Sequence, residues 1–87
     1  MSLTFPNESR SYDHTRRAVR FWGHDTSMEM SFFVTVDALR ALEPGTLPEE
    51  PALLAAFDRH RDRIINAAAK VYRRGTQGSY ELREGDF

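Results

Sequence analysis

Two short apolar segments that alternate with polar residues, joined by a turn, constrain the fold of this chain more than any other feature. Ala18–Trp22 has the sequence AVRFW, Met28–Val34 has the sequence MEMSFFV, and GHDTS lies between them. Successive side chains of a strand point to opposite faces, so this alternation is typical of a strand with one buried face. Glycine, aspartate and serine favour turns. The pattern predicts a β-hairpin whose turn opens at Gly23.

The apolar residues also predict the register of this hairpin. Pairing Trp22 with Glu29 gathers the apolar side chains on one face, whereas a slip of one residue would place Phe21 against Glu29. The predicted inner face consists of Val19, Phe21, Met30 and Phe32. The predicted outer face keeps Arg20, Trp22 and Phe33.

Two helices are expected after the hairpin. Thr35 or Asp37 can cap a short helix, which Pro44-Gly45 ends. A long amphipathic helix is expected from about Pro51 to Arg74, because proline suits a first turn and apolar residues recur at helical spacing. Its predicted apolar face consists of Leu53, Phe57, His60, Ile64, Ala68 and Val71.

Further strands are expected before the hairpin and after the long helix. Leu3–Phe5 predicts a short strand that Pro6 ends, and Ser11–Asp13 is the candidate start of a strand that pairs with the next one. After a turn at Gly78, Tyr80 and Leu82 should share the buried face of a last strand. The order β-β-β-α-α-β predicts one α+β domain over residues 1–87. It is a two-layer fold: an antiparallel sheet of three to four strands covered by one short and one long helix.

Several segments together resemble a known family of short bacterial proteins, catalogued as domain of unknown function 1488. These segments are LTFPNESRSYD, RRAVRFWGHD, SFFVTVDAL, LLAAFDRHRDRI and KVYRRGTQGSYELREGDF. The likeness runs nearly end to end, and the phrases AVRFWG and SYEL…DF carry most of it. The resemblance implies a bacterial cytosolic domain with an antiparallel sheet covered by two helices. It implies no activity and no functional residues.

The composition narrows the classes of function. The chain has no cysteine, which excludes disulfides, thiolate zinc sites and iron–sulfur clusters. Its net charge of −1 argues against a dedicated nucleic-acid binder, which usually carries a basic excess. We expect neither a signal peptide nor a membrane span, so a cytoplasmic location is the default.

The three histidines give little support for catalysis. His14 and His24 each adjoin an aspartate, but neighbours in an extended chain point to opposite sides and no metal-ligand spacing is present. His60 is either a buried neutral histidine with one hydrogen-bond partner or a functional residue in a cleft. We expect a protein that is not an enzyme and that uses no cofactor and no metal.

The outer face of the hairpin is the first candidate binding surface, because it holds more aromatic area than a small solvated sheet needs. The candidate contact residues are Arg16, Arg17, Arg20, Trp22 and Phe33. Three explanations stay open. In the first, the N-terminal segment, Tyr12 or Phe87 covers the aromatic rings. In the second, a second copy or a partner protein covers them. In the third, the rings stack on nucleic-acid bases.

The long helix is the second candidate surface, as an anion or nucleic-acid contact. The residues concerned are Arg59, Arg63, Lys70, Arg73 and Arg74. A salt-bridged, solvated face is the simpler interpretation, since Asp62 can pair with Arg59 one turn back. We therefore expect a protein-interaction or self-association module whose partner is a protein or another copy. The alternative is a nucleic-acid-binding or transcription-regulatory accessory protein that uses this helix.

Overall fold

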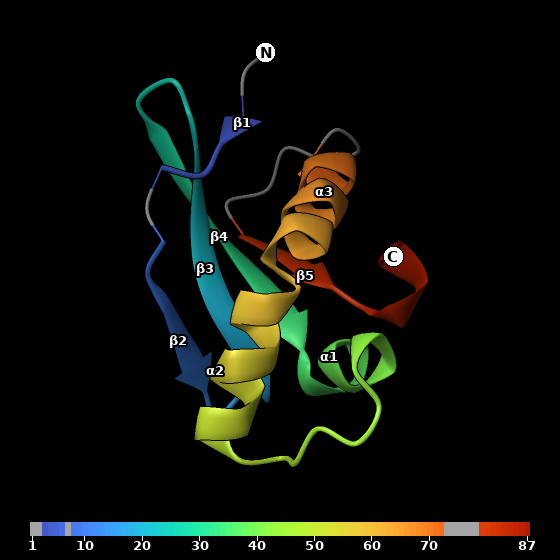
Figure 1. The fold of residues 1–87 in the computed structure, drawn as a ribbon. Coiled ribbons are helices and arrows are strands. Elements are labelled where there is room, and N and C mark those ends of the chain that lie inside the picture. The colour runs from blue at the N-terminus through green and yellow to red at the C-terminus, as the bar shows by residue number, and fades with distance from the viewer. Residues whose placement is uncertain (1–2, 7, 73–78) are drawn as a thin grey trace.

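The computed structural model describes residues 3–6, 8–72 and 79–87. The elements follow in the order β1 (Leu3–Thr4), β2 (Arg10–Asp13), β3 (Ala18–Asp25), β4 (Met28–Thr35), α1 (Val36–Leu42), α2 (Glu50–Arg59), α3 (Arg61–Tyr72), β5 (Ser79–Leu82) and the 3₁₀ helix η1 (Glu84–Asp86). In Figure 1, α2 and α3 lie in front of the sheet and α1 closes its lower end. The predicted α+β fold of two layers is confirmed.

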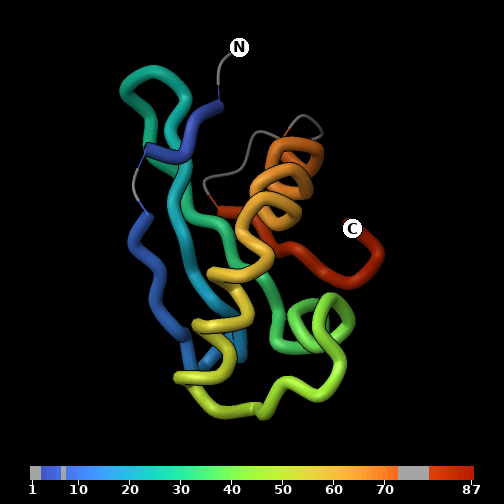
Figure 2. Tube along the Cα trace, viewed as in Figure 1, coloured from blue at the N-terminus to red at the C-terminus, as the bar shows by residue number. Residues whose placement is uncertain are grey.

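The sheet is mixed rather than antiparallel. β3 and β4 form its antiparallel centre. On the side of β3 away from β4, β1 pairs with the C-terminal end of β3 and β2 with its N-terminal end. β5 pairs with β4 in parallel, which corrects the predicted antiparallel arrangement. The chain leaves β4, passes through all three helices and returns to the adjacent edge (Figure 2). Such a crossover brings a strand back in the same direction as its neighbour.

The hairpin is longer than predicted, and its register is displaced. Trp22 pairs with Ser31 rather than Glu29, and only Thr26 and Ser27 form the turn. Gly23 lies within β3, where an added Cβ would come within 2.8 Å of the Phe5 ring. A displacement of two residues preserves the face of every side chain, so the predicted inner and outer faces are both correct.

The core lies between the inner face of the sheet and the helices. The Phe21 ring lies 5.2 Å from that of Phe57 on α2, and Phe32 stacks on Tyr80 at 5.3 Å. The partly buried side chains against this same core include Phe5, Tyr12 and Phe87. These three side chains therefore pack on the helix side of the sheet, and they do not cover Trp22 and Phe33.

The predicted long helix consists of two helices that meet at His60. The φ and ψ of His60, −113° and 20°, are not helical, and its N–H points to the carbonyl oxygens of both Ala56 and Phe57. The apolar spacing continues through the break, because Leu53 and Ile64 on either side are both fully buried. The predicted end of this helix, at Arg73-Arg74, lies outside the described residues.

The short helix begins as predicted. Thr35 is its N-cap, and the Thr35 hydroxyl oxygen accepts a hydrogen bond of 3.1 Å from the N–H of Ala38. Among the described residues, no helix has the length and hydropathy that crossing a bilayer requires.

Candidate functional site

The sheet face opposite the helices carries the predicted aromatic and basic side chains. The register of β3 and β4 places three cross-strand pairs there in successive rows: Arg20 beside Phe33, Trp22 beside Ser31, and His24 beside Glu29. Trp22 is half-buried, whereas only 5% of Phe33 is exposed. We call this surface the outer face, made of these six residues and Arg16.

Guanidinium groups cover the aromatic rings of the outer face. Arg16 Cζ lies 4.1 Å from the centre of the Phe33 ring, and Arg20 Cζ lies 5.7 Å from Phe33 and 5.0 Å from Trp22. Arg20 also donates from Nε and Nη2 to Ser31 Oγ, at 3.2 and 2.9 Å. A cation over an aromatic face is attracted by the negative charge of that face. The Arg16 and Arg20 side chains therefore help to cover the Phe33 ring.

The charges of the outer face lie at its two ends. Within the described residues, neither the Arg16 nor the Arg20 guanidinium has a carboxylate partner. Glu29 lies in the row farthest from them, 3.5 Å from His24, with 55% of its side chain exposed. Glu81 lies beside Phe33 on β5, but it pairs with Arg83 at 2.6 Å. The face thus has a cationic end and an acidic end, with the Trp22 row between them.

Arg17 was predicted with this surface but is held mainly through its backbone. It has a φ of 51°, in the left-handed region, and its carbonyl oxygen accepts a hydrogen bond from the N–H of Val36 at 3.0 Å. With Arg16 and the start of α1 it lines a small hollow of about 160 Å³. Asp37 also lines that hollow, which leaves it without a strong preference for anions.

The described basic residues of the predicted long helix have different surroundings. Arg59 pairs with Glu43, not with Asp62 as predicted, because the α1–α2 loop brings Glu43 to the end of α2. Arg63 and Lys70 line a separate hollow beside the C-terminal segment. Arg73 and Arg74 lie outside the described residues.

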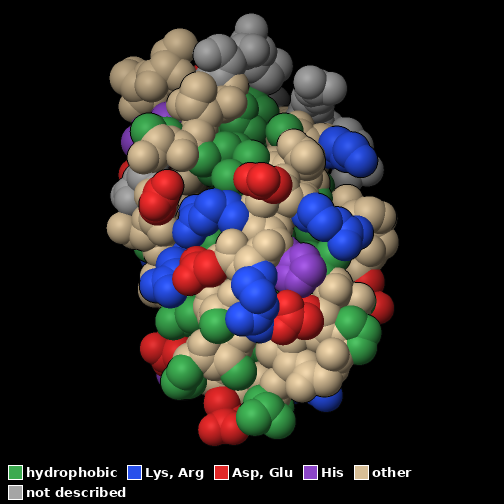
Figure 3. Space-filling view, viewed as in Figure 1, with side chains coloured by type: hydrophobic (Ala, Val, Ile, Leu, Met, Phe, Trp, Pro, Cys, Tyr) green, Lys and Arg blue, Asp and Glu red, His purple; other side chains and the backbone are tan. Residues whose placement is uncertain are grey.

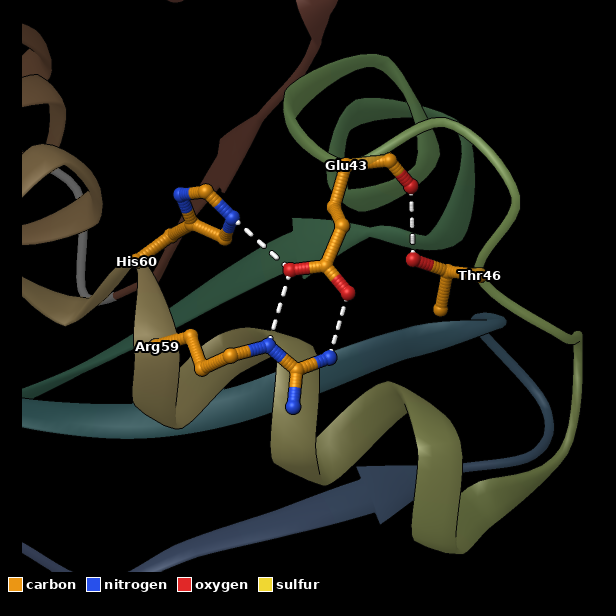
Figure 4. A network of polar contacts seen from close by, with 4 residues as sticks. All are labelled: Glu43, Thr46, Arg59 and His60. Atoms are coloured by element: carbon orange, nitrogen blue, oxygen red, sulfur yellow. Dashed lines mark hydrogen bonds and ion pairs between the residues drawn. The ribbon is translucent and has the colours of Figure 1, made fainter.

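Glu43 is at the centre of a polar network that sequence analysis missed (Figure 4). Its carboxylate accepts hydrogen bonds from Arg59 Nε, at 2.9 Å, and Nη2, and its Oε1 lies 3.0 Å from His60 Nε2. Thr46, which is buried, donates to the carbonyl oxygen of Glu43 at 2.6 Å. Hydrogen bonds from Arg59 and then from His60 lower the pKa of Glu43 to about 2.

This network joins the end of α1 to the junction of α2 and α3. His60 is half-buried and its Nε2 contacts Glu43, and both interpretations proposed from the sequence stay predictions. Both oxygens of Glu43 are occupied, which makes the carboxylate a poor proton acceptor for a substrate. In the described ranges, no three His, Cys, Asp or Glu side chains gather as a metal ion would require.

Comparisons with known proteins agree with the fold. A family model described as "Protein of unknown function (DUF1488)" matches residues 3–83, so the chain belongs to this family, as the sequence resemblance indicated. A similar solved structure is that of a protein of unknown function from this family from Shewanella loihica PV-4. It shares 20% identity and a TM-score of 0.83, over 93% of this chain and 91% of the other, and at that identity it supports the fold alone. A search of curated proteins found no match.

Proposed function

We propose that this protein is a non-enzymatic, cytoplasmic interaction module that associates with a second copy of itself through the outer face. One observation carries the proposal: the described helices lie on one side of the sheet, while the other side holds Trp22 and Phe33 beneath guanidinium groups that have no carboxylate partner among the described residues. A half-buried tryptophan next to arginine is typical of the centre of a protein interface.

The distribution of charge supports a second copy as the partner. A twofold axis that lies between two outer faces and runs across the strands places each row 20/33 over the partner's row 24/29. The row that contains Arg20 in one copy then faces the row that contains Glu29 in the other, with Glu29 beside the His24 that lies over Arg20, and Trp22 lies near the axis. A twofold axis along the strands would place the row that contains Arg20 over the same row of the other copy and bring the cationic ends together, which like-charge repulsion disfavours. The charges therefore select one dimer arrangement.

The structure gives less support to nucleic acid as the ligand. The Phe33 ring is already covered by two guanidinium groups, which leaves Trp22 as the accessible stacking platform of the outer face. The alternative surface on the long helix loses Arg59 to its pair with Glu43.

A charge-exchange experiment tests the proposed dimer. We expect the wild-type protein to be dimeric by size-exclusion chromatography with light scattering. We expect Arg20→Glu and Glu29→Arg, taken singly, to shift the protein to a monomer, since each places like charges opposite one another. The double variant Arg20→Glu/Glu29→Arg restores the opposite-charge contacts and should restore the dimer.

The matched control is Arg40→Glu on α1, an exposed arginine outside the outer face. It should leave the dimer unchanged, and circular dichroism should show that all variants are folded. A wild-type monomer at high protein concentration would contradict the proposal. So would a double variant that stays monomeric while both single variants and the control remain folded.

A further inference from the structure

A second candidate site lies on the helix side of the sheet, away from the outer face. A hollow of about 240 Å³ separates α3 from the C-terminal segment that contains η1. It is lined by Arg63, Asn66, Ala67, Lys70, Asp86 and Phe87. Figure 3 shows Lys and Arg side chains gathered over α3 and beside this segment.

The α3 side of the hollow offers hydrogen-bond donors. Arg63, Asn66 and Lys70 are spaced by three and four residues, which places them on the same face of the helix. Their guanidinium, amide and ammonium groups together supply N–H donors that suit the oxygen atoms of a phosphate or a carboxylate. Ala67, between them, is buried and leaves room for a ligand because its side chain is small.

Among the described residues, the two cations of the hollow lack the ion pairs that Arg59 and Arg61 form. Arg59 pairs with Glu43, and Arg61 lies 3.5 Å from Asp58. Arg63 and Lys70 have neither an ion pair nor a hydrogen bond to any residue in the described part of the chain. Both cations line one hollow, and each therefore favours an anion bound between them.

The opposite wall limits which anions fit. The Asp86 carboxylate accepts a hydrogen bond from the N–H of Arg83 at 2.8 Å, which fixes it at the start of η1. This carboxylate disfavours ligands with many negative charges, such as a nucleic-acid strand. Phe87 is partly buried against the core and adds an aromatic surface to the same hollow. The walls thus suit one oxyanion group attached to an apolar body.

We propose that this hollow binds a small organic molecule with a single phosphate or carboxylate group. Arg63, Asn66 and Lys70 bind the oxyanion, and Ala67 and Phe87 contact the organic part. The assignment is independent of the proposed dimer, because it uses no residue of the outer face.

Titration of ¹⁵N-labelled protein by NMR, at constant ionic strength, tests the site. The probes are inorganic phosphate, phenyl phosphate and benzoate. We expect saturable shifts in the backbone amides of residues 63–70 and 84–87 and in the side-chain amide of Asn66. Phenyl phosphate should bind more tightly than inorganic phosphate, because only phenyl phosphate has an apolar group to place against Phe87. The comparison with benzoate decides between phosphate and carboxylate as the preferred group.

Two variants and one control locate the binding. Arg63→Gln and Lys70→Gln should each weaken phenyl phosphate binding about tenfold, the effect of losing one charge-assisted hydrogen bond. Arg40→Gln on α1 removes an exposed arginine outside the hollow and should leave binding unchanged. The assignment is overturned if the shifts do not saturate, or if the two variants bind like the wild type. A single-stranded oligonucleotide that binds more tightly than phenyl phosphate, with shifts across α2 or the outer face, would also overturn it.

Discussion

At the scale of single residues, Gly23 shows how local propensity misled the sequence analysis. Glycine next to aspartate and serine favours a turn, yet Gly23 is paired with Met30 inside the hairpin. Glycine occurs within strands where another group approaches the backbone closely, and here the group is an aromatic ring. That contact joins Phe5, which follows β1, to β3, so it depends on tertiary structure and cannot be predicted from the residues beside Gly23.

Replacing Gly23 by alanine should destabilise the fold. The new Cβ would lie 2.8 Å from Phe5 Cε2 and 3.0 Å from Phe32 Cε1, and Phe32 is held between the rings of Phe21 and Tyr80. We expect the free energy of unfolding to fall by about 1–3 kcal/mol in urea titrations, as for other overpacked cores. Gly85→Ala is the control, since its Cβ would meet nothing within 4 Å. Equal stability of the two variants would contradict this assignment.

The outer face could be predicted in part from single residues. Alternation correctly placed Arg20, Trp22 and Phe33 on the side away from the helices, because a strand has a fixed side-chain period. The covering of Phe33 by Arg16 could not be predicted, because Arg16 belongs to the turn before β3 and its position depends on how β2 pairs.

At the scale of elements, the break between α2 and α3 has no marker in the sequence. No glycine or proline lies near His60, and the apolar spacing is continuous from Leu53 to Ile64. The break coincides instead with the tertiary contact of Arg59 and His60 with Glu43. Glu43 follows directly after α1, so two elements distant in sequence determine where the helix ends. The parallel direction of β5 was also not predicted. That direction depends on which strand β5 pairs with, and this is a tertiary contact as well.

Glu43 should contribute to stability in a defined range of pH. Its pKa falls from 4.5 to about 2 on folding, so its contribution is present above pH 4.5 and is lost as the pH falls toward 2. The melting temperature of the wild type should decrease across this range. That of Glu43→Gln should decrease less steeply, while still decreasing, because Arg10 also lowers the pKa of Asp58.

Scanning calorimetry between pH 5 and pH 2 measures this difference. Glu49→Gln is the control, because Glu49 is exposed and makes no side-chain hydrogen bond at the start of α2. It should follow the wild-type curve. Parallel curves for Glu43→Gln and the wild type would show that the network in Figure 4 adds no pH-dependent stability.

At the scale of the whole molecule, the two sides of the sheet differ in what covers them and in the charges that they carry. The inner side is closed by α2 and α3, with Phe21 against Phe57, and this layer accounts for the buried core. The outer side has no helix among the described residues and carries charges that are opposite in sign at its two ends. The sequence was sufficient to predict which face of the hairpin the helices cover. Only one face of its strands was apolar enough to pack against the apolar face of the predicted long helix.

The accessibility of Trp22 is the most direct test of the role proposed for the outer face. It is the one tryptophan in the chain, so its fluorescence reports on the outer face alone. We would measure iodide quenching of this fluorescence from micromolar to millimolar protein, with Arg20→Glu as the monomeric reference. The account predicts that quenching of the wild type decreases as concentration rises, while quenching of the variant stays constant. Quenching of the wild type that is independent of concentration, in a protein that remains monomeric, would contradict it.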